Sequence, residues 1–180
     1  MMSFLRFLLS LVCWCLVSFQ VVAQDASDRP YVLGPGDQIQ IQVYGEEDLT
    51  VKLRIEEHGI VSYPFLGDIQ VSGLPTTVLQ RKIYNGLKGD YLVNPDVRVF
   101  VLEYRPIYVN GQVRRPGGYP YVPGLTVQKA ISLAGGMTDL ASTRGLSLIR
   151  EGDDKNKAVS VSMDSPVGPG DILVVEERFF

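Results

Sequence analysis

Glycine or proline interrupts this chain about every eight to twelve residues from Tyr31 onward, which is the spacing of short β-strands joined by turns. The clearest strand, 38–44, alternates isoleucine or valine with glutamine. One of its faces is therefore predicted to be buried, and the other to meet solvent or a partner. Similar apolar segments follow at 51–55, 60–65 and 69–71. The pattern restricts the first half of the chain mainly to short strands.

Two helices are expected among these strands, one in each half. Apolar residues recur every four positions over 76–87, where Thr77 and Gln80 have the spacing of a capping box. A second helix is expected to start after Thr126 as its cap and to end at Gly135-Gly136, whose backbone tolerates left-handed angles. Each half thus combines strands with one principal helix, which predicts an α+β fold of two small mixed domains.

Arg105-Pro106 is the expected hinge between the two domains. Just before it, the segment 97–104 is apolar on both faces and is expected to be buried between layers. The second half is expected to contain a hairpin of 146–150 with 158–162, and a final strand at 172–175. Halves of about 75 residues are near the size at which a core alone stabilises a domain, so we expect them to share an interface.

Residues 1–23 have the pattern of a secretory signal peptide, with Arg6 before an apolar core and small or medium residues ending at Ala23. A retained anchor is the alternative, but the apolar stretch is short and polar for a membrane span of about 20 residues. We expect cleavage after residue 23, a flexible leader at 24–29, one domain at 30–104 and a second at 105–180.

Cys13 and Cys15 both lie in the apolar core of this predicted signal peptide. Neither follows the small residue that lipoprotein processing needs, so the chain is not expected to be a lipoprotein. Cleavage would remove both, leaving no disulfide and no thiol chemistry. The net charge of −3 also argues against a nucleic-acid partner, which would require a clustered basic face.

Catalytic motifs are scarce. His58 is the single histidine, so a zinc site cannot be assembled from histidine and cysteine, and no glycine-rich phosphate loop occurs. The acidic clusters Glu46-Glu47-Asp48 and Glu56-Glu57 leave a glycan hydrolase open, because that chemistry needs only two carboxylates about 5–10 Å apart. Solvated acids are the alternative. We expect no catalytic residue, no metal and no cofactor.

Tyrosine and arginine supply the candidate contact residues. Tyr119 and Tyr121 are predicted to share one face of a strand beside Arg114 and Arg115. Tyrosine offers a flat apolar face with a polar tip, which suits a sugar or a protein interface. The alternative is a half-buried cross-strand pair with solvated arginines.

One short motif occurs twice, as Gly34-Pro35-Gly36-Asp37 and Gly168-Pro169-Gly170-Asp171. Proline fixes φ, glycine permits a tight turn, and aspartate can accept a backbone hydrogen bond just before a strand. We interpret both as structural turns; the repeat is too short to prove duplication.

Several separated motifs resemble the outer-membrane polysaccharide export (OPX) family. The export-domain motifs are 31–44 (YVLGPGDQIQIQVY), 59–69 (GIVSYPFLGDI), 72–74 (SGL) and 94–99 (NPDVRV). The motifs that resemble the soluble-ligand-binding β-grasp (SLBB) repeat are 109–113 (VNGQV), 115–117 (RPG), 125–127 (LTV), 130–131 (AI) and 134–136 (AGG).

The resemblance implies a periplasmic protein that forms a ring-shaped homo-oligomer and conducts capsule or exopolysaccharide outward with an inner-membrane polysaccharide copolymerase, without catalysis. Larger members add β-grasp repeats and a membrane-crossing C-terminal helix, whereas this sequence stops at Phe180. We therefore expect a short member under a separate outer-membrane β-barrel, with Phe179-Phe180 as a docking tip or packed on its own fold. The alternative is a periplasmic oligosaccharide-binding module that holds its ligand near Arg114, Tyr119 and Tyr121.

Overall fold

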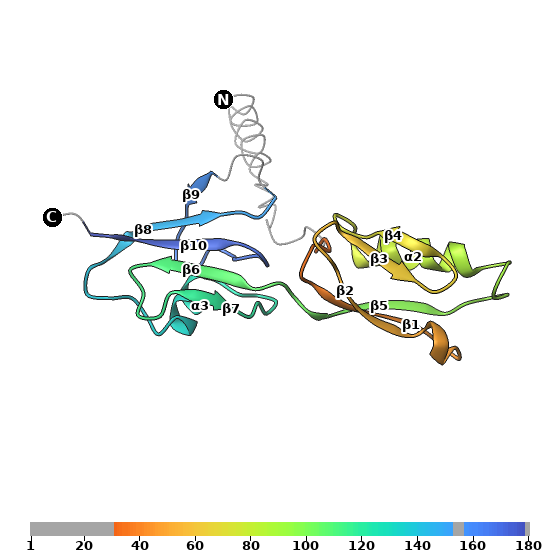
Figure 1. The fold of residues 1–180 in the computed structure, drawn as a ribbon. Helices are drawn as coiled ribbons and strands as arrows, with labels where there is room; N and C mark the ends of the chain where they lie inside the picture. The colour runs from red at the N-terminus through yellow and green to blue at the C-terminus, as the bar shows by residue number, and fades with distance from the viewer. Residues whose placement is uncertain (1–30, 153–156, 179–180) are drawn as a thin grey trace, which may run out of the picture.

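The computed structural model describes residues 31–152 and 157–178. The expectations for the signal peptide, the leader and Phe179-Phe180 lie outside the described residues. Figure 1 shows two lobes, placed end to end and joined by the stretch between strands β5 and β6. Each lobe has its own sheet and one α-helix, which confirms the predicted mixed α+β fold.

The first lobe is built on a three-stranded antiparallel sheet in the order β2-β1-β5. Ile41 of the central strand lies opposite both Val51 and Val99, so the alternating apolar residues meet on one face. A separate hairpin and one α-helix complete the lobe. Its elements are β1 (Gln38–Val43), the 3-10 helix η1 (Glu47–Leu49), β2 (Val51–Arg54), β3 (Ile60–Tyr63), β4 (Gly67–Gln70), α2 (Thr76–Leu87) and β5 (Val97–Glu103).

Helix α2 confirms the predicted range 76–87, and its four-residue apolar repeat buries Leu79, Ile83 and Leu87 in the core with the inward face of β1. The predicted capping box is wrong. Pro75 is the N-cap residue and no side chain caps the helix, because Thr77 already lies inside its first turn. Pro75 instead supplies the fixed φ of −62° from which the helix begins.

Strand β5 corrects a second expectation, that 97–104 is buried on both faces. Its inward residues Val97 and Val99 are buried, but Phe100 and Leu102 are each 44% exposed. The reason is topological, because β5 is the edge of a sheet that α2 covers on one face only. The outer face therefore presents two large apolar side chains beside the glutamines of β1.

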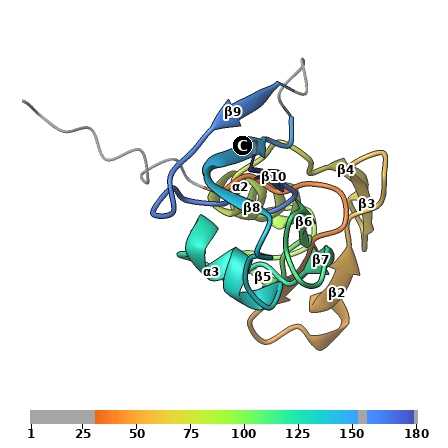
Figure 2. The same cartoon turned by 90° about the vertical axis from the view of Figure 1, so that its left-hand side faces the viewer.

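The second lobe is a five-stranded sheet in the order β7-β6-β10-β8-β9, in which only the β6–β10 pair is parallel. Figure 2 shows α3 lying against one side of this sheet, where Val127, Ala130 and Ile131 join the core. Its elements are β6 (Ile107–Gly111), β7 (Gly117–Tyr119), α3 (Val127–Leu133), β8 (Ala141–Ile149), β9 (Ala158–Ser160) and β10 (Ile172–Glu177).

Two local predictions for the second lobe are confirmed. The Thr126 hydroxyl accepts a hydrogen bond from the Lys129 N–H at 3.4 Å and caps α3, and Gly135 follows the helix with φ +82°. The predicted hairpin forms between β8 and β9, although β8 begins earlier, at Ala141. Among the described residues, no helix is long and apolar enough to cross a membrane.

Candidate functional site at the interdomain junction

The two Gly-Pro-Gly-Asp motifs form the same turn on opposite sides of the junction between the lobes. In each, the aspartate N–H donates to the carbonyl of the first glycine at 3.2 Å, closing a four-residue turn. The second glycines, Gly36 and Gly170, have φ of +91° and +81°. Proline followed by a left-handed glycine is the requirement of a type II turn. A strand begins directly after each turn, β1 after the first and β10 after the second.

The aspartate of each turn folds back onto its own loop. Asp37 Oδ2 accepts from the Gly34 N–H at 2.9 Å, and Asp171 Oδ2 accepts from the Gly168 N–H at 2.8 Å. The second carboxylate oxygen of each accepts another backbone N–H, from Arg105 at 2.9 Å and from Glu151 at 3.3 Å respectively. Both aspartates are buried, so these hydrogen bonds replace the water they have lost.

Each buried aspartate also pairs with an arginine. Arg105 Nη1 lies 3.0 Å from Asp37 Oδ2, and Arg150 Nη1 lies 2.8 Å from Asp171 Oδ2. The two pairs differ in burial, because the Arg105 side chain is 14% exposed and that of Arg150 is 43% exposed. The first pair is thus held largely away from water, where charge pairing acts more strongly than at the surface.

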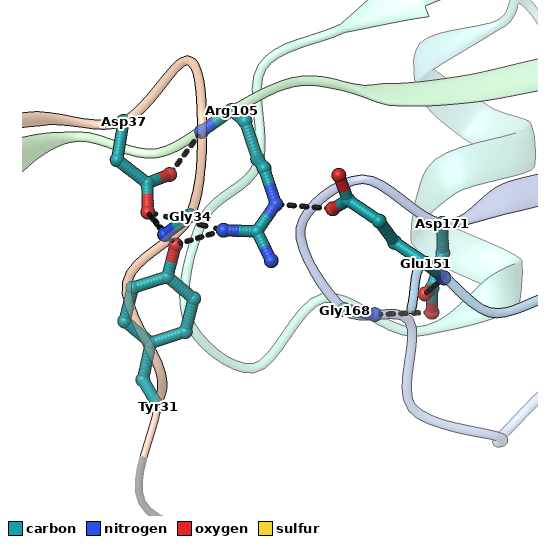
Figure 3. Close-up of polar contacts among 7 residues, drawn as sticks. All are labelled: Tyr31, Gly34, Asp37, Arg105, Glu151, Gly168 and Asp171. Atoms are coloured by element: carbon teal, nitrogen blue, oxygen red, sulfur yellow. Dashed lines mark hydrogen bonds and ion pairs between the residues drawn. The ribbon is translucent and has the colours of Figure 1, made fainter. Parts of the chain in front are cut away.

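Arg105 connects the two turns across the junction (Figure 3). While Nη1 bonds to Asp37 of the first lobe, Nε bonds to the carboxylate of Glu151 in the second. The backbone N–H of Glu151 in turn bonds to Asp171. We call Asp37, Arg105, Glu151 and Asp171 the interdomain clamp. Hydrogen bonds from Gly170 N–H to the Pro106 carbonyl, at 3.1 Å, and from Tyr108 N–H to the Asp171 carbonyl, at 2.9 Å, tie the second turn to the chain that leaves the junction.

Tyrosines surround the clamp. The Tyr31 hydroxyl donates to Asp37 Oδ2 and accepts from Arg105 Nη1 at 2.8 Å. Its ring meets that of Tyr104 edge to face at 4.9 Å, and Tyr104 meets Tyr121 of the second lobe at 5.2 Å. Burial, followed by the hydrogen bond to Asp37, raises the pKa of Tyr31 well above its usual range. Burial also raises the pKa of Tyr121.

The acidic neighbours of Arg105 keep its guanidinium protonated. Burial by itself would lower the pKa of Arg105, but the hydrogen bond to Glu151 and the electrostatic interactions with Tyr31, Asp37 and Glu151 more than compensate and raise it. The guanidinium therefore stays protonated at the junction. A positive charge placed between two carboxylates from different lobes favours one relative placement of the lobes.

At two glycines of the turns, an added side chain would meet the charged ends of the clamp. A Cβ on Gly34 would lie 2.6 Å from Arg105 Nη1, and one on Gly170 would meet the Glu151 carboxylate and lie 3.0 Å from Arg105 Nε. Any side chain at these positions would displace Arg105 or Glu151. The repeated motif therefore serves the junction as well as the local turns.

The structure brings Tyr119 and Arg115 together but sets Tyr121 apart from them. Arg115 Nη2 donates to the Leu133 carbonyl at the end of α3, at 3.2 Å, and the Tyr119 hydroxyl donates to the Arg115 carbonyl at 2.5 Å. Arg114 is exposed nearby. Strand β7 ends at Tyr119, so Tyr121 lies beyond it, and both rings are half-buried against the core of the second lobe. The Tyr121 ring packs edge to face against the Tyr104 ring.

The acidic residues considered for hydrolysis lie on the first lobe. Glu47 and Asp48 belong to η1, where they are exposed together with Glu46, and His58 occupies an exposed turn. His58 and Glu56 line a hollow of about 370 Å³ together with Arg54 and Asp68. No group of three or more histidine, cysteine, aspartate or glutamate side chains within 31–152 and 157–178 is arranged to hold a metal ion.

Sequence reasoning missed four residues of the junction, namely Tyr31, Arg105, Arg150 and Glu151. A signal for the arginines was present, because an aspartate fixed in a tight turn before a buried strand needs a cationic partner. Arg105 is also part of the predicted hinge, although no bonding role was predicted for it. No local pattern indicates that Glu151, 46 residues away, would be its second partner.

Each of the two lobes matches the model of a known protein family. A family model described as polysaccharide biosynthesis/export protein matches residues 25–102, and one described as SLBB domain matches residues 106–158. The exopolysaccharide production protein ExoF of Rhizobium meliloti is 43% identical over 44% of this chain and 19% of its own length. The polysialic acid transport protein KpsD of Escherichia coli is 30% identical over 59% of this chain and 20% of its own length.

A third relative covers more of the chain. The EPS I polysaccharide export outer membrane protein EpsA of Ralstonia nicotianae is 26% identical over 85% of this chain and 49% of its own length. The chain thus spans between about a fifth and about half of the length of these relatives. Because the two family models match in succession on either side of Arg105, the chain belongs to the polysaccharide biosynthesis/export (OPX) family and carries one export domain followed by one SLBB domain.

Proposed function

We propose that this chain is a periplasmic subunit of a polysaccharide export conduit, which passively guides capsule or exopolysaccharide towards an outer-membrane pore. The observation that carries the proposal is the succession of an export domain and an SLBB domain, matched over 25–102 and 106–158. The names of the relatives, which refer to exopolysaccharide production, polysialic acid transport and polysaccharide export, support transport as the role.

The interdomain clamp supports a structural role in such a conduit. A wall built from identical subunits needs each subunit to keep one shape, because small angular errors accumulate around a closed ring. Arg105 bonds to Asp37 in one domain and to Glu151 in the other, which favours a single angle between them. We therefore propose a ring-shaped homo-oligomer in which the clamp keeps successive subunits alike.

The remaining parts of the proposal concern partners and location. Residues 1–23 would direct export of the chain to the periplasm as a signal peptide and would then be cleaved. The mature chain would receive polymer from an inner-membrane copolymerase and pass it to a separate outer-membrane β-barrel. Weak, repeated hydrogen bonds along the lumen would let a hydrated polymer advance without being held. The protein would act without catalysis, metal or cofactor.

The proposal is tested by deleting the gene and measuring polymer inside and outside the cells. The expected result is that polymer synthesis continues while surface and extracellular polymer is lost, and that the intact gene restores it. A version encoding a chain without residues 1–23 should fail to restore export. Normal extracellular polymer in the deletion strain would refute the role in export.

The ring is tested separately on the purified chain lacking residues 1–23. Native mass spectrometry over a range of concentrations should show one closed oligomer, alone or with the copolymerase. A chain that stays monomeric under all these conditions would refute the homo-oligomeric conduit.

A further inference from the structure

Two neighbouring hollows lie beside strand β5 in the export domain. One, of about 300 Å³, lies on the outer face of the sheet, and the other, of about 420 Å³, lies between β5 and α2. Asp96 lines both, so the two hollows meet at that residue. Their volumes fall within the range of about 300–1,000 Å³ that small-molecule sites occupy. We call the pair the β5 groove.

The two halves of the β5 groove contain the same set of chemical groups. The outer half is lined by Gln42, Tyr44 and Arg98, and the half beside α2 by Gln80, Arg81 and Tyr84. An amide both donates and accepts hydrogen bonds, a guanidinium donates several, and a phenol does both on a flat apolar ring. Such a combination suits a ligand whose surface alternates hydroxyl groups with flat apolar faces.

The backbone holds these groups in place. The Tyr44 N–H donates to the Asp96 carbonyl at 2.9 Å, and Gln42 lies directly opposite Arg98 in the β1–β5 ladder. On α2, Gln80 and Tyr84 are four residues apart and therefore share one face of the helix.

Exposed aromatic rings complete the outer half. Tyr44 is 80% exposed and Phe100 is 44% exposed, and both line this half, so their rings are accessible to a ligand there. Phe100 lies opposite Gln40 and next to Arg98 along the strand, which mixes the apolar surface with polar groups.

Charge determines which saccharide fits. Arg81 and Arg98 line the groove, and Lys88 Nζ adjoins it through a hydrogen bond to the Tyr84 hydroxyl at 2.9 Å, against the single carboxylate of Asp96. Arg98 and Asp96 are 3.8 Å apart with side chains 66% and 59% exposed. A pair with this geometry is weak and leaves the guanidinium able to bond a ligand.

We propose that the β5 groove binds a segment of an acidic saccharide, with Arg81 and Arg98 contacting its carboxylates and the tyrosines its ring faces. The inference rests on the proposed export function and adds to it the position and the charge preference of a polymer contact. Binding would be weak, because the groove is open and its side chains are exposed.

The test is a ¹⁵N chemical-shift titration of the purified chain lacking residues 1–23 with hexagalacturonate, and with maltohexaose as the neutral probe. The expected shifts saturate with hexagalacturonate and are confined to 42–44, 77–84 and 95–100. The double variant Arg81→Gln with Arg98→Gln should bind at least about tenfold more weakly, since each loses a charged hydrogen bond. Arg144→Gln, an exposed arginine of the SLBB domain, is the matched control.

Several results would overturn the proposal: no saturating shifts, shifts elsewhere in the protein, equal binding of maltohexaose, or an equal loss of affinity in Arg144→Gln. Thermal melting checks that the double variant is folded. Should it melt early, Gln42→Ala with Gln80→Ala removes both amides instead, and unchanged hexagalacturonate binding by that variant would also count against the groove.

Complementation of the deletion strain separates this inference from the proposed function. If the strain exports polymer normally, the export function itself fails. If the strain loses export and the double arginine variant restores it fully, only the groove inference fails. Reduced export by that variant, with oligomer formation unchanged, is the expected result.

Discussion

Replacing Asp37 with alanine should destabilise the protein far more than any exposed ion pair. The carboxylate is fully buried and accepts from the Tyr31 hydroxyl, two backbone N–H groups and the Arg105 guanidinium. Its removal leaves the backbone N–H groups of Gly34 and Arg105 without their acceptor at the junction. Breaking a buried pair costs about 3–5 kcal/mol, and Arg105 still retains Glu151, so we expect a loss of about 3 kcal/mol.

The equivalent change at Asp171 should cost less, about 1–2 kcal/mol, because its partner Arg150 is 43% exposed and can be hydrated instead. Glu103→Ala is the matched control, since Glu103 forms a 3.0 Å ion pair with Arg54 but is 63% exposed, and should change stability by less than about 1 kcal/mol. Urea denaturation followed by far-ultraviolet circular dichroism gives the free energies of unfolding. A loss for Asp37→Ala no larger than that for Glu103→Ala would refute the reasoning, as would a larger loss for Asp171→Ala.

Three further changes test other parts of the structure. Gly34→Ala should lower the free energy of unfolding in urea by about 1–3 kcal/mol, because its Cβ would lie 2.6 Å from Arg105 Nη1; unchanged stability would contradict this contact. Glu151→Gln should change the free energy of unfolding by less than about 1 kcal/mol, since the Glu151 side chain is 41% exposed. The same variant should broaden the distribution of interdomain angles measured by residual dipolar couplings. The control Glu103→Gln should leave that distribution unchanged. Burial raises the pKa of Tyr63 to about 12, against about 10 in the unfolded chain. The free energy of unfolding should therefore decrease between pH 10 and pH 12, by up to about 1.4 kcal/mol per pH unit. Tyr63→Phe should remove this part of the slope in urea denaturation at each pH, and an unchanged slope would argue against it.

Local patterns predicted most of the fold. The alternation of apolar and polar residues predicted which face of β1 is buried, and the four-residue apolar repeat predicted the bounds of α2. Both features depend on residues that are close in the sequence. The exposure of Phe100 and Leu102 was not predictable in this way. Apolar residues on both faces of a strand indicate burial only if both faces are covered, and the position of β5 at a sheet edge is set by pairing with β1, more than 50 residues earlier.

Prediction of the junction from the sequence had the same limit, because its contacts join residues that are distant in the sequence. The two Gly-Pro-Gly-Asp turns were visible in the sequence, and so was the hinge at Arg105-Pro106. Their connection was not, because it depends on Glu151 reaching Arg105 from the β8–β9 side of the other domain. Tyr121 likewise looked like part of an open aromatic face, but its ring packs towards Tyr104 across the junction. Such contacts follow from the relative placement of the domains, which no local pattern encodes.

The position of β10 has a consequence for the order in which the protein acquires its shape. A chain that emerges N-terminus first has completed its first sheet at Glu103, whereas the second sheet lacks a central strand until Ile172–Glu177 inserts between β6 and β8. Asp171 immediately precedes this strand, so the second half of the junction forms in the same late step. A chain that lacks β10 would have an incomplete second sheet, and the Asp171 turn would lose the strand that anchors it, so the junction between the domains forms only once the last strand is in place.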